Sequence, residues 1–283
     1  MKQNKDNTYP IDTDKAWDNL YSRLKNDRLL PCESHRKRKI PLQWIATAAA
    51  IFAGVIFSIF YFSQNRDDSI VFLQNKDDTG TLVATLEDSS VVYLAGNASI
   101  SCPAVFAKNQ RKVELKGNAL FCVAKDAKRP FIIETDKNVT IEVVGTIFAV
   151  QSSPENPFEL SVKQGKVKVY SKGDKNPVPL VAGETVQLKT NGMTKFQTAD
   201  FQVFNSFTNK MCFKDEKLNN IVNAINIVYG SPKIITEESI NNRTLTVTFE
   251  NDSVETMSEL ICMALNLKQI NKQDTIFIRQ SLK

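Results

Sequence analysis

The sequence predicts a single-span membrane protein whose larger part is an all-β domain followed by a small α+β domain. Three observations lead to this fold class. Residues 40–62 carry no charge, residues 80–192 break into short apolar runs, and residues 210–283 alternate between strand and helical periods. A long uncharged run is typical of a membrane helix, and closely spaced short runs are typical of a sandwich, a barrel or a solenoid-like stack.

The uncharged run at 40–62 favours a transmembrane helix by its length. As a helix it would measure about 34 Å, whereas the hydrocarbon core of a bilayer is about 30 Å thick. Trp44 and Tyr61 stand near its two ends, where amphipathic rings prefer the membrane interface. A buried helix of a soluble protein is rarely this long, and a cleaved signal peptide lies closer to the N-terminus.

The charges around this run predict its orientation. The flank that follows it offers only Arg66, before two aspartates. Residues 1–39 hold ten basic and six acidic residues, an excess of four, out of the chain's 36 Lys+Arg and 31 Asp+Glu. Positive flanks stay in the cytoplasm, so residues 1–39 are predicted inside and residues 64–283 outside. Four consecutive cations directly before the run carry this topology signal: Arg36, Lys37, Arg38 and Lys39.

The cytoplasmic segment predicts one amphipathic helix. Trp17, Leu20, Tyr21 and Leu24 recur at helical spacing and form an apolar stripe. A lone helix cannot bury such a stripe by itself. The stripe is therefore predicted to contact a partner protein, to pack on the membrane surface, or to remain poorly ordered.

The region 80–192 is predicted to be β-rich because its runs are short, β-branched and separated by turn residues. VELK and KVKVY alternate strictly, which predicts one wet and one dry face. Gln164-Gly165 favours a hairpin turn, and Gly117, Gly145 and Gly183 have similar separating positions. The predicted strands are SVVYLA (90–95), RKVELKG (111–117), ALFCVA (119–124), PFIIETD (130–136), VTIEVVGTIFAVQ (139–151), FELSVKQGKVKVYS (158–171) and ETVQLKT (184–190).

The last part of the chain predicts a β-α-β-β-α-β module. Strands are expected at 211–213, 233–236, 244–249 and 275–280, with helices at 218–225 and 254–264. An exposed strand edge of this module could accept a partner strand. The predicted organisation is a cytoplasmic segment (1–39), a transmembrane helix (40–62), a linker (63–79), the β-rich domain (80–192), a second linker (193–209) and the α+β domain (210–283).

The residues that chemistry would need are scarce, so no enzyme activity, cofactor or metal is predicted. The only histidine is His35, on the cytoplasmic side, which argues against a Ser-His-Asp or Cys-His arrangement outside. The four outer cysteines lack the C-x-x-C spacing of zinc sites, and their apolar surroundings favour structural thiols, although sequence does not settle their pairing. These cysteines are Cys102, Cys122, Cys212 and Cys262. A membrane-anchored hydrolase is the weaker alternative.

Four motifs in the β-rich region together resemble the FecR family of bacterial membrane anti-sigma regulators. They are L-x-D-x-S-x-V-x-L (86–94), R-x-V-x-L-x-G-x-A-x-F (111–121), VAKD-x-x-x-PF (123–131) and VxGTxFxV (143–150), with VKQGKVKV and AGETVQL further on. The likeness covers residues 80–192. The C-terminal module resembles the small domain that often follows in this family.

The resemblance implies a transmembrane signal relay. In this family the periplasmic part contacts a TonB-dependent outer-membrane transporter, and the cytoplasmic part binds an extracytoplasmic-function (ECF) sigma factor. The implied location is the bacterial inner membrane, and no direct contact with nucleic acid is expected. Trp17, Leu20, Tyr21 and Leu24 are the predicted sigma-factor contacts. Because family members usually carry a longer cytoplasmic region, a non-signalling periplasmic scaffold that has lost sigma binding by N-terminal truncation is the alternative.

Overall fold

The computed structural model describes residues 12–29, 54–58, 69–174 and 176–281. The chain divides into two compact units, residues 1–66 and 67–283. In the first unit, helix α1 (Thr13–Asn26) confirms the helix predicted from the spacing of apolar residues. It begins after Asp12, whose carboxylate accepts a hydrogen bond of 3.2 Å from the backbone N–H of Lys15. This cap satisfies one of the unpaired N–H groups of the first turn.

The prediction of a single membrane-spanning helix over residues 40–62 is wrong. Among the described residues, no helix combines the length and the apolar character that crossing a membrane requires. Residues 54–58 of the predicted span are helical, and the rest of the span lies outside the described residues. The uncharged run meets the length criterion for a span, but that criterion counts side chains and does not establish a continuous helix. The described fold is instead mostly β-sheet.

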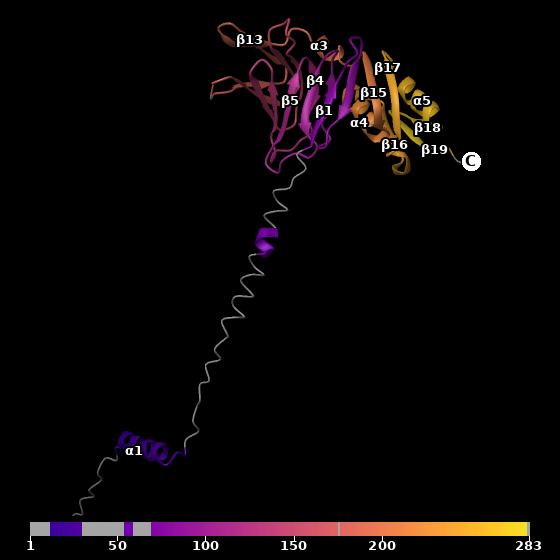
Figure 1. Ribbon diagram of the computed structural model, residues 1–283. Helices are drawn as coiled ribbons and strands as arrows, with labels where there is room; N and C mark the ends of the chain where they lie inside the picture. The colour runs from indigo at the N-terminus through magenta and orange to yellow at the C-terminus, as the bar shows by residue number, and fades with distance from the viewer. Residues whose placement is uncertain (1–11, 30–53, 59–68, 175, 282–283) are drawn as a thin grey trace, which may run out of the picture. The chain divides into compact units, whose positions relative to one another are not determined.

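Two large sheets form most of the second unit (Figure 1). The seven-stranded sheet has the order β1 (Ile70–Gln74), β4 (Ser99–Pro103), β5 (Arg111–Lys116), β7 (Phe131–Thr135), β8 (Val139–Val143), β11 (Lys166–Ser171) and β12 (Val178–Val181). The nine-stranded sheet has the order β14 (Gly192–Gln197), β13 (Glu184–Lys189), β10 (Glu159–Gln164), β9 (Ile147–Gln151), β6 (Ala119–Cys122), β3 (Val91–Leu94), β2 (Thr81–Thr85), β15 (Lys210–Lys217) and β17 (Thr244–Glu250).

The remaining elements gather at the C-terminal end of the unit, drawn in orange to yellow in Figure 1. A three-stranded sheet has the order β16 (Lys233–Thr236), β19 (Thr275–Gln280) and β18 (Leu267–Lys272). Helices α4 (Leu218–Tyr229) and α5 (Val254–Leu265) and the short helix η1 (Glu238–Ile240) accompany it. The exception is the short helix α3 (Gln202–Asn205), which lies beside β9 of the nine-stranded sheet. The predicted strand-and-helix order is present, with β18 as an additional strand.

Two hydrophobic cores lie on opposite faces of the nine-stranded sheet. Val92 and Phe121 point into the core between the two large sheets. Their neighbours Tyr93 and Leu120 point into the second core, with α4 and α5. Side chains alternate across a strand, so β3 and β6 are buried on both faces. This double burial explains their continuous apolar sequences.

The punctuating glycines mark corners at which the chain passes from one large sheet to the other. Gly145 separates β8 from β9, and Gly165 separates β10 from β11. The predicted hairpin at Gln164-Gly165 is therefore wrong, because β10 and β11 belong to different sheets. A Cβ atom on Gly165 would lie 2.6 Å from Cγ2 of Thr146, so the corner has room for glycine alone.

The C-terminal elements continue the fold of the β-rich region without a break. β15 pairs in parallel with β2 through Met211↔Thr81 and Cys212↔Leu82. The hydroxyl of Tyr93 donates a hydrogen bond of 3.0 Å to the carbonyl of Ala224 on α4. Residues 193–209, predicted as a linker, contain most of β14 and all of α3, and Phe204 is buried there. The predicted division at this segment into two separate domains stays a prediction.

Candidate functional site

Helix α1 leaves its predicted contact face open. Trp17 is 68% exposed, Tyr21 is 61% exposed and Leu20 is also exposed, whereas Leu24 is half-buried. An isolated apolar stripe of this kind is unfavourable in water, so the face suits a partner. The assignment of these four residues to partner binding stays a prediction. The topology residues Arg36, Lys37, Arg38 and Lys39 lie outside the described residues, as does His35.

The motif residues of the β-rich region converge on one buried arginine. Arg111, at the start of β5, has a fully buried side chain and lies 2.7 Å from a carboxylate oxygen of Asp88, whose side chain is 2% exposed. Its Nε and Nη1 each donate a 2.9 Å hydrogen bond, to the carbonyls of Arg129 and Ala124 respectively. The guanidinium also lies 5.3 Å from the centroid of the Phe131 ring. A buried charge is tolerated when it is paired and hydrogen-bonded in this way.

Asp88 is held by the turn that precedes β3. Its two carboxylate oxygens accept hydrogen bonds from the hydroxyl and the backbone N–H of Ser90, at 2.6 and 3.0 Å. The same Ser90 hydroxyl oxygen accepts a 3.0 Å hydrogen bond from the N–H of Ala124. The aspartate and serine of the first motif therefore connect directly to the arginine of the second and the loop of the third.

The loop at 123–130 is held from its other side by the VxGT motif. The N–H of Val123 donates to the carbonyl of Thr146, and the N–H of Asp126 donates to that of Val144, both at 2.9 Å. Gly145 lies between them with φ +146°, and a Cβ atom there would approach Cα of Lys125 to 2.8 Å. All four motifs thus meet in one network, called here the motif network, which comprises Asp88, Ser90, Arg111, residues 123–130 and residues 144–146.

The motif network is structural. Its ion pair is closed to solvent, and both members of the pair already have protein partners. The hydroxyl of Thr146 is buried without a hydrogen-bond partner among the described residues. A ligand could not reach the guanidinium without opening this part of the fold. Surfaces that meet other molecules must therefore lie elsewhere on the chain.

Cys102, Cys122, Cys212 and Cys262 are free, as the structural-thiol interpretation predicts. Three of them are buried, and Cys212 is half-buried. Burial raises the pKa of the Cys122 thiol to about 12 and that of Cys262 to about 11. Burial also raises the pKa of Tyr93 well above its ordinary value. These groups stay protonated at neutral pH, so the thiols are poor nucleophiles.

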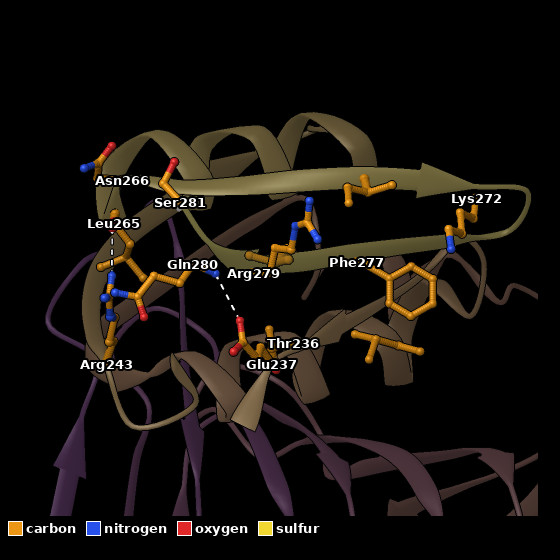
Figure 2. A pocket seen from close by; sticks show the side chains of 13 residues that line it. Thr236, Glu237, Arg243, Leu265, Asn266, Lys272, Phe277, Arg279, Gln280 and Ser281 are labelled. Carbon is orange, nitrogen blue, oxygen red and sulfur yellow. Dashed lines mark hydrogen bonds between the residues drawn. The ribbon is translucent and has the colours of Figure 1, made fainter. Parts of the chain in front are cut away.

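A surface hollow of about 1170 Å³ lies on the three-stranded sheet. Figure 2 shows Phe277, Arg279 and Gln280 along β19, with Lys272 near Phe277 and with Arg243, Leu265 and Asn266 at the far end. The end is fixed by two hydrogen bonds. Arg243 donates to the carbonyl of Leu265 at 2.9 Å, and the N–H of Gln280 donates to the carboxylate of Glu237 at 3.2 Å.

An apolar row crosses the middle of this sheet. Ile235 on β16 is opposite Phe277 on β19, which is opposite Ile270 on β18. Ile235 is 46% exposed and Phe277 is 37% exposed. The other face of the sheet carries Ile234, Ile276 and Ile278, which are buried in the core with α4 and α5. We call the surface that carries Ile235, Phe277 and Ile270 the open face.

Sequence reasoning did not identify the open face as a site. The available signal was the continuous apolar character of KIIT and TIFI, which predicts strands with apolar groups on both faces. The strand β18, with the sequence LKQINK, was missed because its polar residues outnumber its apolar ones. Without this strand, Ile270 could not be placed beside Phe277, so the row of three apolar residues could not be predicted.

The match to a family model agrees with the motifs. The sequence model of the family described as FecR protein matches residues 77–168. No curated protein matches the chain. A crystal structure at 2.50 Å of a proposed anti-sigma factor from Parabacteroides distasonis ATCC 8503 is 21% identical to this chain. That alignment covers 76% of this chain and 100% of that chain, with a TM-score of 0.46.

A second crystal structure with the same description and organism, at 1.65 Å, is 22% identical. It covers 75% of this chain and 100% of its own, with a TM-score of 0.45. The family match carries the identification, because it includes all four motifs that build the motif network. Residues 77–168 of this chain therefore match the FecR family model and contain the motifs that build the motif network.

Proposed function

We propose that this chain is an anti-sigma factor of the FecR type, a regulator rather than an enzyme. The observation that carries the proposal is the FecR match at residues 77–168. That region contains the complete motif network, so the family's structural signature is present as a folded unit. A sigma factor is the partner that this function requires.

The proposed sigma-factor contact is the apolar stripe of α1. Trp17, Leu20 and Tyr21 are exposed on one side of a capped helix. Amphipathic helices bind proteins by laying such a stripe into an apolar groove. Tryptophan and tyrosine are enriched among the residues that dominate interface energies. We propose an ECF sigma factor as the occupant.

Co-purification tests this contact. The full chain and a Trp17→Ala, Leu20→Ala variant are each produced with the ECF sigma factors of the same organism. We expect the sigma factor to be recovered with the parent chain, and its affinity for the variant to fall at least about tenfold, because two interface anchors are removed.

A matched variant on the other side of α1 provides the control. At about 100° per residue, Asn19 and Ser22 lie opposite the stripe, and both are exposed. Asn19→Ala, Ser22→Ala should retain binding. Equal recovery with both double variants would remove the stripe as the contact, and recovery of no sigma factor with the parent chain would overturn the proposed function.

The finer proposal places residues 70–281 in the periplasm, where they contact the signalling domain of a TonB-dependent outer-membrane transporter. The support is the FecR match together with β17, which ends the nine-stranded sheet and pairs only with β15 among the described strands. Such an edge can accept a strand from a partner.

Two measurements test the finer proposal. An alkaline phosphatase fused to the C-terminus should be active if this part is periplasmic. A photo-crosslinking side chain at exposed Thr248 on β17 should capture the transporter, whereas one at exposed Lys116 on β5 should not. An inactive fusion would reject the periplasmic location. Equal capture at the two positions would reject the edge strand β17 as the contact.

A further inference from the structure

The open face has apolar residues where a solvent-facing sheet normally has polar ones. The row Ile235–Phe277–Ile270 lies directly across three neighbouring strands. Strands that are apolar on both faces are found where both faces are covered. Helices α4 and α5 cover one face of this sheet. The second face has no such cover among the described elements, and Phe277 and Ile235 remain exposed there.

The dimensions of the open face fit one helix. Three strands about 4.8 Å apart span about 10 Å between their outer members. The diameter of an α-helix with its side chains is about 10–12 Å. The strands are four to six residues long, or about 13–20 Å, and a helix of about 9–13 residues has that length.

The charges on the open face indicate which charges a partner should carry. Period-two alternation places the cations of β16, β19 and β18 on the same side as the apolar row. Lys233 and Lys272 lie on one side of the row, and Arg279 and Lys268 lie on the other. None of these four cations takes part in an ion pair with another described residue; Lys272 only approaches the Phe277 ring, at 5.7 Å.

Glu237 is the single acid among the described residues that line the hollow, and its carboxylate accepts the N–H of Gln280. Arg243 adds a further cation at the end of the face, visible on the left of Figure 2. Complementarity therefore requires an anionic ligand with an apolar centre. Helix α1 of this chain does not meet this requirement, because Thr13–Asn26 contains three cations and two acids.

We propose that the open face binds one amphipathic helix of a partner protein, whose apolar stripe is flanked on both sides by Asp or Glu. The stripe covers Ile235, Phe277 and Ile270. The acids meet Lys233 and Lys272 on one side and Lys268 and Arg279 on the other. The inference is independent of the sigma-factor contact, since it uses only residues 233–280.

Binding of synthetic helices to the full chain tests the proposal. The first probe is a hydrocarbon-stapled peptide of about 12 residues, with a leucine stripe flanked by glutamates. The second has lysine in place of each glutamate, and the third is the first without its staple and with a central proline. Fluorescence anisotropy should give at least about tenfold tighter binding for the acidic helix than for either other peptide.

Two variants locate the binding site, and each has a matched control. Phe277→Ser and Arg279→Glu should each weaken binding of the acidic helix at least about tenfold. Phe72→Ser, at an exposed phenylalanine of β1, and Lys116→Glu, at an exposed lysine of β5, should not. Arg279→Glu changes only an exposed side chain, so it remains informative if Phe277→Ser does not fold.

Four results would overturn the inference. Equal affinity for the acidic and basic helices would show that charge does not select the ligand. Equal affinity for the proline peptide would show that the ligand is not a helix. Absence of binding at millimolar peptide, or equal losses in the control variants, would show that the open face is not the site. The sigma-factor experiment on the α1 variants has no bearing on these four results, because α1 is not part of the open face.

Discussion

The motif network and the open face both place a cation over a phenylalanine ring, yet they use it in opposite ways. Arg111 lies 5.3 Å from the centroid of Phe131, and Lys272 lies 5.7 Å from that of Phe277. The arginine is fully buried, and carbonyls and a carboxylate surround it. The lysine is exposed and has no ion-pair partner among the described residues. Burial and hydrogen bonding, rather than residue type, therefore distinguish a cation that stabilises the fold from one that can contact another molecule.

This contrast explains why the family motifs do not mark a binding surface. An ion pair and hydrogen bonds of Arg111, Asp88 and Ser90 hold the two large sheets and the loop at 123–130 together. The exposed faces, on α1 and on the three-stranded sheet, lie outside residues 77–168. The region that matches the FecR model is therefore held by buried contacts, whereas these two exposed apolar faces lie outside it.

Removing Arg111 should give the largest loss of stability. Arg111→Met leaves the Asp88 carboxylate buried without its counter-charge, and we expect a cost of about 3–5 kcal/mol in the free energy of unfolding. Lys112→Met, which removes the partly exposed pair with Glu134, should cost at most about 1 kcal/mol. Urea unfolding of the full chain measures both. Similar losses would mean that the buried pair is not the special element of the network.

Adding a side chain at the sheet corner tests the same network through the backbone. Gly145→Ala places a Cβ atom near Cα of Lys125 at φ +146°, and the backbone strain alone should cost about 1–3 kcal/mol. Gly173 also has positive φ, at +86°, but a Cβ atom there would meet nothing within 4 Å. Gly173→Ala should therefore cost less in the same urea experiment. The reverse order would contradict the close approach.

Alkaline pH should expose the contribution of a buried thiol. The unfolded chain releases the Cys122 proton near 9.0, and the folded chain holds it to about 12. Above pH 9 the unfolded state therefore binds fewer protons, and the folded state loses up to about 1.4 kcal/mol of stability per pH unit from this group. Below pH 9 this contribution is fully present.

Cys122→Ala removes this contribution. Its loss of stability relative to the parent, measured at pH 7, gives the packing cost alone. That loss should shrink as the pH rises from 9 to 11, when both proteins are unfolded in urea at each pH. A constant difference across this range would contradict the raised pKa of Cys122.

The smallest effect is expected where the β-rich region meets the C-terminal helices. Tyr93→Phe removes the hydrogen bond to the carbonyl of Ala224, at a cost of about 0.5–1.5 kcal/mol. Tyr170→Phe removes a 3.2 Å hydrogen bond to Glu142 at the surface and should cost less. Thermal unfolding of the full chain compares them. An equal effect would mean that the buried contact adds nothing beyond a surface hydrogen bond.

The sequence predicts most individual strands and both C-terminal helices, because alternation and helical spacing are local properties. β5 alternates between buried and exposed residues as VELK predicts. What sequence could not predict is which strands share a sheet. The turn at Gly165 reads as a hairpin locally, yet it leads into the opposite sheet, because pairing depends on partners far away in the chain.

The predicted membrane helix shows the same limit from the other direction. Residues 40–62 have the length and the lack of charge that are typical of a membrane helix. Among the described residues, however, no helix is long and apolar enough to cross a membrane. Phe204 and Phe207 are buried, whereas Phe201 is 50% exposed, and a segment this short did not reveal which of its phenylalanines would be covered. The open face was likewise invisible, since it needs three strands brought together from residues 233–280.

The seam between β2 and β15 has a mechanical consequence. It consists of two parallel residue pairs, whereas β15 and β17 share six. A pulling force on the C-terminal elements would act on this short ladder and also on the core that Tyr93 and Leu120 share with α4 and α5. The ladder alone does not hold the two parts together, so such a force would have to separate the buried core as well.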